Sequence, residues 1–146
     1  METQHTNLLP QFTAPEAKVL IVDDTPTDIR IARELLIPCG VKVYISRSGT
    51  EAIEMVQKER YDLVFMDQMM PGMGGMEVIS RIRDLSADDG YFRNLPIVAL
   101  TASTLDGLEE IFAEMGANGF ITKPIDQAKL FDIIEKLLPA EKVIRA

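Results

Sequence analysis

The sequence predicts an α/β fold in which five short parallel strands alternate with helices within one domain. Short runs of apolar, often β-branched residues recur along the 146 residues, and a stretch with helical spacing follows each run. Because the runs are apolar at nearly every position, they suit parallel strands that are buried on both faces. Crossovers between such strands are right-handed, so we expect a doubly wound sheet with helices on both faces. The predicted strands are Lys18–Val22, Lys42–Ile45, Leu63–Met66, Ile97–Leu100 and Phe120–Thr122.

The predicted helices are marked by their capping residues and by their apolar faces. After the first strand, Thr25 is placed to cap a helix, Pro26 suits its first position, and Asp28 lies in its first turn. The stretch Ser48–Glu51 has the pattern of a capping box at the start of the second helix. The polar stretch Ser86–Asn94, before the fourth strand, is expected to be a surface loop. Apolar residues at helical spacing mark the last two helices: Leu108, Ile111, Phe112 and Met115, and Leu130, Ile133, Ile134, Leu137 and Leu138.

The two tails set the expected boundaries of the domain. Residues 1–16 are polar and interrupted by proline, which indicates a flexible lead-in or linker. Residues 17–139 contain the five strand–helix units, and residues 140–146 are expected to form a C-terminal tail. A chain of this length can bury a core without disulfides, and its single cysteine, Cys39, cannot form an internal one.

Composition narrows the class of function. The net charge of −8 argues against direct binding to nucleic acid or to an anionic membrane surface, because both would repel the chain. No apolar run approaches the ~18 residues that a membrane span needs, and the lead-in lacks the features of a signal peptide. Together with the lone cysteine, these observations lead us to expect a cytoplasmic protein.

Polar side chains follow four of the five predicted strands, at the point where each strand ends. Asp23 and Asp24 follow the first strand, Asp67 the third, Thr101 the fourth, and Lys123 the fifth. Taken singly, an acid or a threonine after a strand is often only a helix cap, and a lysine before proline is often a solvated loop charge. Because sites in open α/β sheets form at the carboxyl ends of the strands, we expect these side chains to converge.

Their chemistry indicates phosphoryl transfer. Three clustered carboxylates repel each other, so they need a cation, and ligands that are all oxygen favour Mg²⁺, with Mn²⁺ as the alternative. Lys123 and Thr101 are suited to bind phosphate oxygens as a point charge and as a hydrogen-bond donor. Asp67 ends a rigid strand and precedes a Pro-Gly turn, so it is the carboxylate that we expect to attack phosphorus and form an aspartyl phosphate.

Four stretches, VLIVDD, LVFMDQMMPGMGG, PIVALTA and GFITKP, together resemble the receiver domain of two-component response regulators. The resemblance extends from about Lys18 to Leu138. It implies a flavodoxin-like fold whose five parallel strands lie in the order 2-1-3-4-5. The stretches MDQMMPGMGG and ITKPID are most similar to receivers that are fused to hybrid sensor histidine kinases, although a stand-alone regulator is the alternative.

The resemblance assigns a role to each residue of the expected site. Asp67 is the phospho-acceptor, and Asp23 and Asp24 are the acidic pair that holds Mg²⁺. The backbone carbonyl of Met69, two residues beyond the acceptor, is a further metal ligand, so its apolar side chain is no obstacle. No organic cofactor is implied.

Three more positions have switch or phosphate-binding roles in the family. Thr101 is the switch hydroxyl, Lys123 pairs with phosphate oxygens, and a cis peptide precedes Pro124. Phe120 occupies the aromatic switch position, and it lacks the hydroxyl of the common tyrosine, so a signal that depends on a phenol hydrogen bond is not expected.

The expected donor is a phosphohistidine on a histidine kinase or on a histidine phosphotransfer domain. The chain's only histidine, His5, lies in the lead-in, so the donor must be elsewhere. The chain is thus not a conventional enzyme, although a receiver catalyses its own Mg²⁺-dependent phosphorylation and dephosphorylation. Phosphorylation is expected to change the face made by the fourth helix, the fifth strand and the fifth helix, through which receivers can form homodimers.

Three alternative functions fit the sequence less well. A phosphatase with an aspartate nucleophile would need a second acid two residues later, where this chain has Met69. A nucleotide-binding module would need a glycine-rich phosphate loop, but the first strand–helix turn reads DDTPTD. A receiver that acts only as a docking surface is disfavoured because the set of three acids, threonine and lysine is complete.

Overall fold

The protein contains a five-stranded parallel sheet with the order that the resemblance implies. A computed structural model describes residues 9–103 and 105–145 of the chain. The sheet order is β3-β2-β4-β5-β6, which is 2-1-3-4-5 when only these strands are numbered, and each neighbouring pair is parallel. Asp67 and Thr101 are the last residues of their strands, one position beyond the predicted ends. The strands are β2 (Lys18–Val22), β3 (Lys42–Ser46), β4 (Leu63–Asp67), β5 (Ile97–Thr101) and β6 (Gly119–Thr122).

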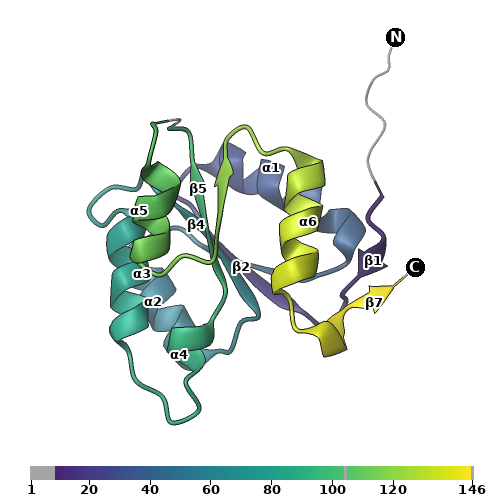
Figure 1. Cartoon of the computed structure of the whole chain (residues 1–146), viewed down its shortest axis with the longest axis horizontal. Coiled ribbons are helices and arrows are strands. Elements are labelled where there is room, and N and C mark those ends of the chain that lie inside the picture. Colours follow the sequence, from purple (N-terminus) through teal and green to yellow (C-terminus); the bar gives the residue numbers. More distant parts are fainter. Residues whose placement is uncertain (1–8, 104, 146) are drawn as a thin grey trace.

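The crossover helices cover both faces of this sheet. Helices α1 and α6 pack on one face, and α2, α3 and α5 pack on the other (Figure 1). The 3-10 helix η1 (Ile37–Cys39) continues α1 and ends at Gly40, whose φ of 72° lies in the left-handed region that favours glycine. The helices are α1 (Pro26–Leu36), α2 (Gly49–Lys58), α3 (Gly75–Asp84), α5 (Leu108–Glu114) and α6 (Gln127–Leu137).

Alternate residues of each central strand enter two separate cores. On β4, Leu63 and Phe65 face α1 and α6, whereas Val64 and Met66 face the other three helices. All four are at most 2% exposed, as expected for a parallel strand covered on both faces. Asp67 is next in this alternation, so it belongs to the side of the sheet that carries α1 and α6.

The capping predictions are confirmed in part at one helix and corrected at another. Ser48 Oγ accepts a hydrogen bond from the backbone N–H of Glu51 at 3.1 Å, which is one half of the predicted capping box. The Glu51 carboxylate accepts from the backbone N–H of Arg47 at 2.9 Å rather than from that of Ser48. Thr25 occupies the N-cap position of α1, but its side chain makes no capping hydrogen bond. Instead, the backbone N–H of Thr25 donates to Asp23 Oδ1 at 3.0 Å. An aspartate side chain therefore forms the turn that starts α1.

The stretch Ser86–Asn94 is more ordered than the surface loop that was predicted. It contains the short helix α4 (Tyr91–Asn94). The Tyr91 hydroxyl accepts a hydrogen bond from the backbone N–H of Tyr61 at 2.7 Å, and the Arg60 guanidinium lies 4.5 Å from the centre of the Tyr91 ring. The side chain of Tyr91 thus anchors this connection near the start of β4. The polar composition of the stretch gave no indication of this contact.

The chain segments on either side of the predicted domain pair with each other. Strand β1 (Phe12–Thr13) and strand β7 (Ile144–Arg145) form a separate antiparallel ribbon (Figure 1). The short helix η2 (Ala140–Lys142) precedes β7, and Lys142 Nζ donates to both carboxylate oxygens of Asp62, at 3.0 and 3.1 Å. The predicted boundaries at residues 16 and 139 therefore lie inside the packed structure, while residues 1–8, with His5, lie outside the described part.

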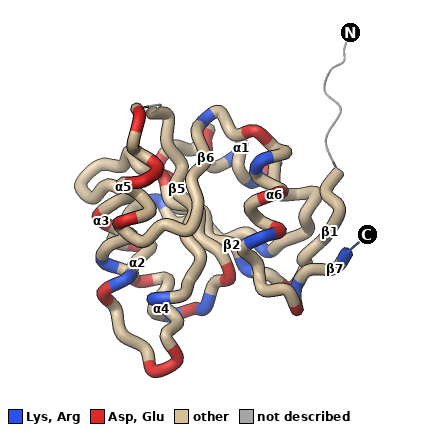
Figure 2. The backbone as a smooth tube through the Cα atoms, viewed as in Figure 1, with Lys and Arg blue, Asp and Glu red and all other residues tan. Residues whose placement is uncertain are grey.

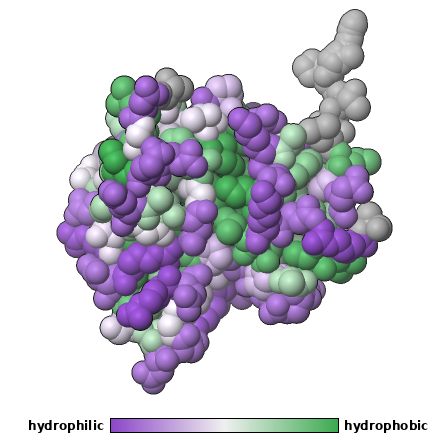
Figure 3. Space-filling model, in the orientation of Figure 1, coloured by the Kyte–Doolittle hydropathy of each residue, from purple (hydrophilic) through white to green (hydrophobic). Residues whose placement is uncertain are grey.

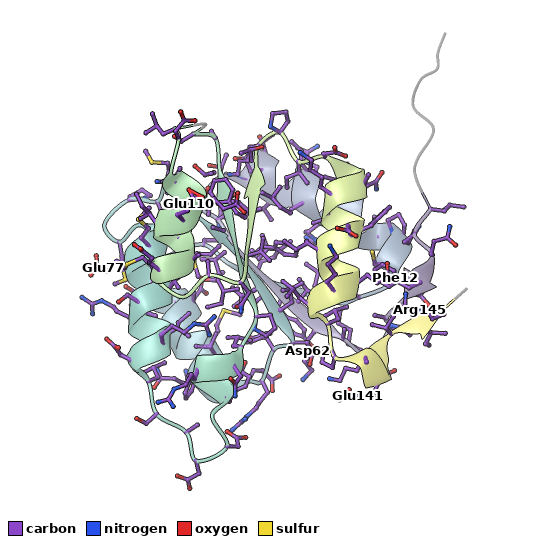
Figure 4. The ribbon with its side chains drawn as sticks, in the orientation of Figure 1. Phe12, Asp62, Glu77, Glu110, Glu141 and Arg145 are labelled. Carbon is purple, nitrogen blue, oxygen red and sulfur yellow. The ribbon has the colours of Figure 1, made fainter. Side chains whose placement is uncertain are left out.

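Phe12 shows that the described part of the predicted lead-in belongs to the core. Its side chain, labelled on β1 in Figure 4, is 2% exposed and packs in the core beneath α1 and α6. We expect Phe12→Ala to lower the free energy of unfolding by about 2 kcal/mol, less than for a central phenylalanine because the short ribbon can partly collapse into the space. Chemical denaturation measures this change.

Leu9 supplies the matched control, because it lies in the same segment and is 80% exposed. Leu9→Ala should leave the unfolding free energy unchanged within about 0.5 kcal/mol. Equal stability of Phe12→Ala and wild type would instead show that the segment contributes nothing to the fold.

Surface charge and helix length bear on membrane contact. Lysine and arginine are interspersed with aspartate and glutamate in the view of Figure 2, without one broad basic area. Of the helices in the described residues, none has both the length and the apolar composition to cross a membrane.

Candidate functional site

The carboxyl ends of the strands bring the predicted side chains to one edge of the sheet. The backbone hydrogen bonds between neighbouring strands continue to this edge. The N–H of Gln68 donates to the carbonyl of Leu100 at 2.9 Å, and the N–H of Lys123 donates to the carbonyl of Thr101 at 2.7 Å. Asp23, Asp67 and Thr101 are polar residues that are at most 4% exposed. Three rigid strand ends therefore hold buried polar groups in fixed positions, as a site requires.

Three carboxylates form an oxygen cluster at this edge. One oxygen each from Asp23, Asp24 and Asp67 lie within 4.8 Å of one another. This donor set contains no nitrogen or sulfur, so it fits a hard divalent cation such as Mg²⁺. Met69, two residues after the end of β4, is 73% exposed. The role of its backbone carbonyl as a metal ligand stays a prediction.

Lys123 lies within the acidic group rather than beside it. Its Nζ donates to Asp67 Oδ1 at 2.9 Å, to Asp28 Oδ2 at 2.9 Å and to Asp23 Oδ2 at 3.0 Å. Burial lowers the pKa of Lys123, but these carboxylates outweigh burial, so that its pKa lies above the ordinary value. The peptide between Lys123 and Pro124 is cis, as predicted. The ammonium is therefore charged at neutral pH and is held by three carboxyl groups.

Asp28 is the member of this group that was predicted only as a helix residue. It lies in the first turn of α1, where an acid is usually explained by the helix dipole. Its place in the site could have been predicted from the face of the sheet on which α1 packs. By the alternation of side chains along a strand, Asp23 and Asp67 lie on that same face. The first turn of α1 covers that side, and thereby brings Asp28 to Lys123.

The environment of Asp67 disfavours its charged form in the absence of a metal. Burial raises the pKa of its carboxyl, the hydrogen bond from Lys123 lowers it, and the charges of Asp23 and Asp24 raise it again, with a net shift upward. One ammonium does not compensate for the surrounding acids. A divalent cation among them would reverse the balance and stabilise the carboxylate, which agrees with the oxygen cluster.

The predicted switch residues lie on the other side of the sheet edge. The Thr101 hydroxyl is hydrogen-bonded to the amide oxygen of Gln68 and accepts from the backbone N–H of Ser103 at 3.0 Å. Phe120 packs against Phe112 of α5, with ring centres 5.6 Å apart. Gln68 was not predicted to take part. Because Gln68 directly follows Asp67, its side chain is expected on the opposite side of the sheet, where Thr101 also lies. The alternation of side chains could therefore have predicted the contact between Gln68 and Thr101.

Gly75, the first residue of α3, packs directly against the main chain at the end of β4. Its backbone N–H donates to the carbonyl of Gln68 at 3.0 Å. A Cβ at this position would lie 2.4 Å from the carbonyl oxygen of Asp67 and 3.0 Å from Gln68 Cα. Because both are main-chain atoms that cannot rotate away, only glycine allows α3 to start this close to Asp67.

The comparisons with known proteins agree with this geometry. Residues 19–135 match the family model described as the response regulator receiver domain. The chain is 35% identical over 127 residues to the sensor protein GacS of Pseudomonas syringae pv. syringae, a match that covers 87% of this chain but 14% of GacS. It is 31% identical over 120 residues to the polar-differentiation response regulator DivK of Brucella anthropi, covering 82% of this chain and 94% of DivK.

Two solved structures are informative about the site. The receiver domain of the sensor histidine kinase PA1611 from Pseudomonas aeruginosa, solved with magnesium in its active site cleft, matches with a TM-score of 0.74 and 29% identity over 83% of this chain and 96% of that one. The receiver domain of Ssk1 from Saccharomyces cerevisiae, solved with the histidine phosphotransfer protein Ypd1, matches with a TM-score of 0.78 and 26% identity over 89% of this chain and 94% of that one.

Proposed function

Because the chain belongs to the response regulator receiver family, we propose that it is a phosphorylation switch in which Asp67 accepts a phosphoryl group from a partner's phosphohistidine. One observation carries the proposal: the carboxylate of Asp67 ends a buried strand, in an oxygen cluster with Asp23 and Asp24 and 2.9 Å from the ammonium of Lys123. This arrangement combines an aimed nucleophile with positive charge for the group that it receives.

The chemical step would be an in-line displacement at phosphorus. A carboxylate oxygen of Asp67 forms the new P–O bond while the P–N bond to the donor imidazole breaks, and the bonding pair leaves with the imidazole nitrogen. Lys123 then donates a hydrogen bond to an oxygen of the phosphoryl group that Asp67 has accepted. Attack of water at the same phosphorus would release inorganic phosphate and restore the Asp67 carboxylate.

The residues that would hold Mg²⁺ are Asp23, Asp24, Asp67 and the carbonyl of Met69. When bound, Mg²⁺ would neutralise charge on the phosphoryl oxygens during transfer. The chain's own contribution is to keep the acceptor dry and fixed, because Asp67 is 4% exposed and the strand beneath it is buried on both faces. Mn²⁺ has the same preference for oxygen ligands and is the expected substitute.

Phosphorylation would change the conformation first at Thr101 and then at the surface. A phosphoryl group brings nearly two negative charges, which would draw the Thr101 hydroxyl away from Gln68 and into a hydrogen bond with phosphate. This movement opens space for Phe120 to turn from its contact with Phe112. The face built by α5, β6 and α6 would change as a result; Figure 3 shows hydrophobic surface in the middle of this face. A homodimer could form there.

The relatives support a proposal for the partner and for the parent protein. The solved complex of Ssk1 with Ypd1 supports a histidine phosphotransfer domain or a histidine kinase as the donor. The chain spans 14% of the length of GacS, which favours the receiver part of a hybrid histidine kinase. DivK, of which it spans 94%, represents the alternative of a stand-alone regulator.

Intact-mass spectrometry after incubation with acetyl phosphate tests the proposal. We expect one phosphoryl adduct when Mg²⁺ is present. In EDTA, adduct formation should slow by at least about a hundredfold, because a metal clamp on a transferring phosphoryl group contributes several kcal/mol. Mn²⁺ should restore the rate. If purified histidine kinases and phosphotransfer domains, like acetyl phosphate, leave the chain unlabelled, it is a docking domain and the proposal is wrong.

A further inference from the structure

Asp28 binds Lys123 rather than the backbone N–H of Thr25, because that N–H already donates to Asp23. As the third residue of α1, it stands where the acid of a capping box would accept from the N-cap backbone N–H. That N–H, on Thr25, instead donates to Asp23 Oδ1 at 3.0 Å. The Asp28 carboxylate therefore reaches across the mouth of the site, and its Oδ2 lies 2.9 Å from Lys123 Nζ.

The contact with Asp28 completes the hydrogen bonding of the ammonium. A lysine ammonium has three N–H donors, and Lys123 directs them to Asp23, Asp28 and Asp67. Two of these partners have other duties, because Asp23 belongs to the oxygen cluster and Asp67 is the proposed acceptor. Asp28 lies outside the cluster, so it can remain on Lys123 when a cation binds.

We infer that Asp28 is a positioning residue that holds the Lys123 ammonium in the resting site and thereby slows phosphoryl acceptance by Asp67. This inference rests on the proposed function and adds to it a residue that sets the rate. Lys123 must turn a donor toward the incoming phosphoryl group, and Asp28 competes for it.

The exposure of the pair limits the size of the effect. The Asp28 side chain is 37% exposed and that of Lys123 is 18% exposed, so water screens the competition in part. For the competition of one screened carboxylate charge with the incoming group for the Lys123 ammonium, we expect about a fivefold change in rate. Asp28→Asn, which keeps the shape and removes the charge, should therefore accept phosphate from acetyl phosphate about five times faster than wild type.

The rates are to be measured at saturating Mg²⁺, so that a change in metal affinity does not enter. Asp28→Glu restores the charge and should bring the rate back toward that of wild type. Glu34→Gln is the matched control, because Glu34 is an exposed acid of the same helix that no described residue pairs with in a salt bridge. Its removal should leave the rate unchanged.

A second comparison shows whether the effect passes through Lys123. In a Lys123→Met background, Asp28→Asn should no longer accelerate acceptance, because there is no ammonium to release. The inference is overturned if Asp28→Asn reacts at the wild-type rate or more slowly, if Glu34→Gln is accelerated equally, or if the acceleration persists without Lys123. Failure of the proposed function is distinct, since then neither wild type nor Asp28→Asn would form any adduct.

Discussion

Asp67→Asn should abolish phosphoryl acceptance. The amide keeps the size of the side chain and can still accept from Lys123, but it is not a nucleophile toward phosphorus at neutral pH. Adduct formation from acetyl phosphate and Mg²⁺ should fall below detection in intact-mass spectrometry, a loss of at least about a thousandfold, because the other carboxylates of the site are expected to bind the metal or Lys123 rather than to attack phosphorus.

Two controls make this result specific. Asp88→Asn removes an exposed acid in the loop before α4 and should be labelled like wild type. Circular dichroism and thermal unfolding should show that Asp67→Asn remains folded. If Asp67→Asn is labelled at the wild-type rate, the acceptor is another residue, and peptide mapping of the adduct would identify it.

Gly75→Ala should be the most damaging small substitution near the site. Its Cβ would lie 2.4 Å from the carbonyl oxygen of Asp67, so that α3 must move away from the acceptor strand. We expect a loss of about 3 kcal/mol in the free energy of unfolding, at the upper end for an inserted methyl group, because the obstructing atoms are main chain. Urea denaturation measures this loss.

The same substitution should impair chemistry in the molecules that stay folded. A displacement of the acceptor by a fraction of an ångström to one ångström can reduce rate by one or two orders of magnitude, so we expect at least about a tenfold slower reaction with acetyl phosphate. Gly74→Ala is the matched control: its Cβ would meet one atom, the Gln68 carbonyl oxygen, at 3.2 Å. Equal effects of the two substitutions would exclude close packing at Gly75 as the cause.

Much of the sheet could be predicted because its signals are local. Strands such as Leu63–Asp67 are apolar up to their last residue, a pattern that favours a parallel sheet covered on both faces. The convergence of Asp23, Asp67, Thr101 and Lys123 also followed from strand ends alone. The strand order, by contrast, came from the family resemblance, because five similar apolar runs do not indicate which of them are neighbours.

The contacts that the sequence did not predict depend on the direction in which a side chain points or on partners that are far apart in the sequence. Asp28 and Gln68 are polar residues with ordinary local explanations, and only the side on which each points reveals a partner in the site. The ribbon of β1 and β7 pairs segments at opposite ends of the sequence, and runs of two residues are too short for any periodicity. Local patterns contain no information about such pairs.

The ribbon of β1 and β7 has a mechanical consequence. Phe12 pairs with Arg145 and Thr13 with Ile144, in antiparallel register, so the chain enters and leaves the domain at the same end of the ribbon. Tension that pulls those two ends apart would load its hydrogen bonds one after another, as in opening a zipper, rather than all together. The ribbon would yield first, at the amino ends of the sheet strands, whereas the proposed phosphorylation site lies at their carboxyl ends.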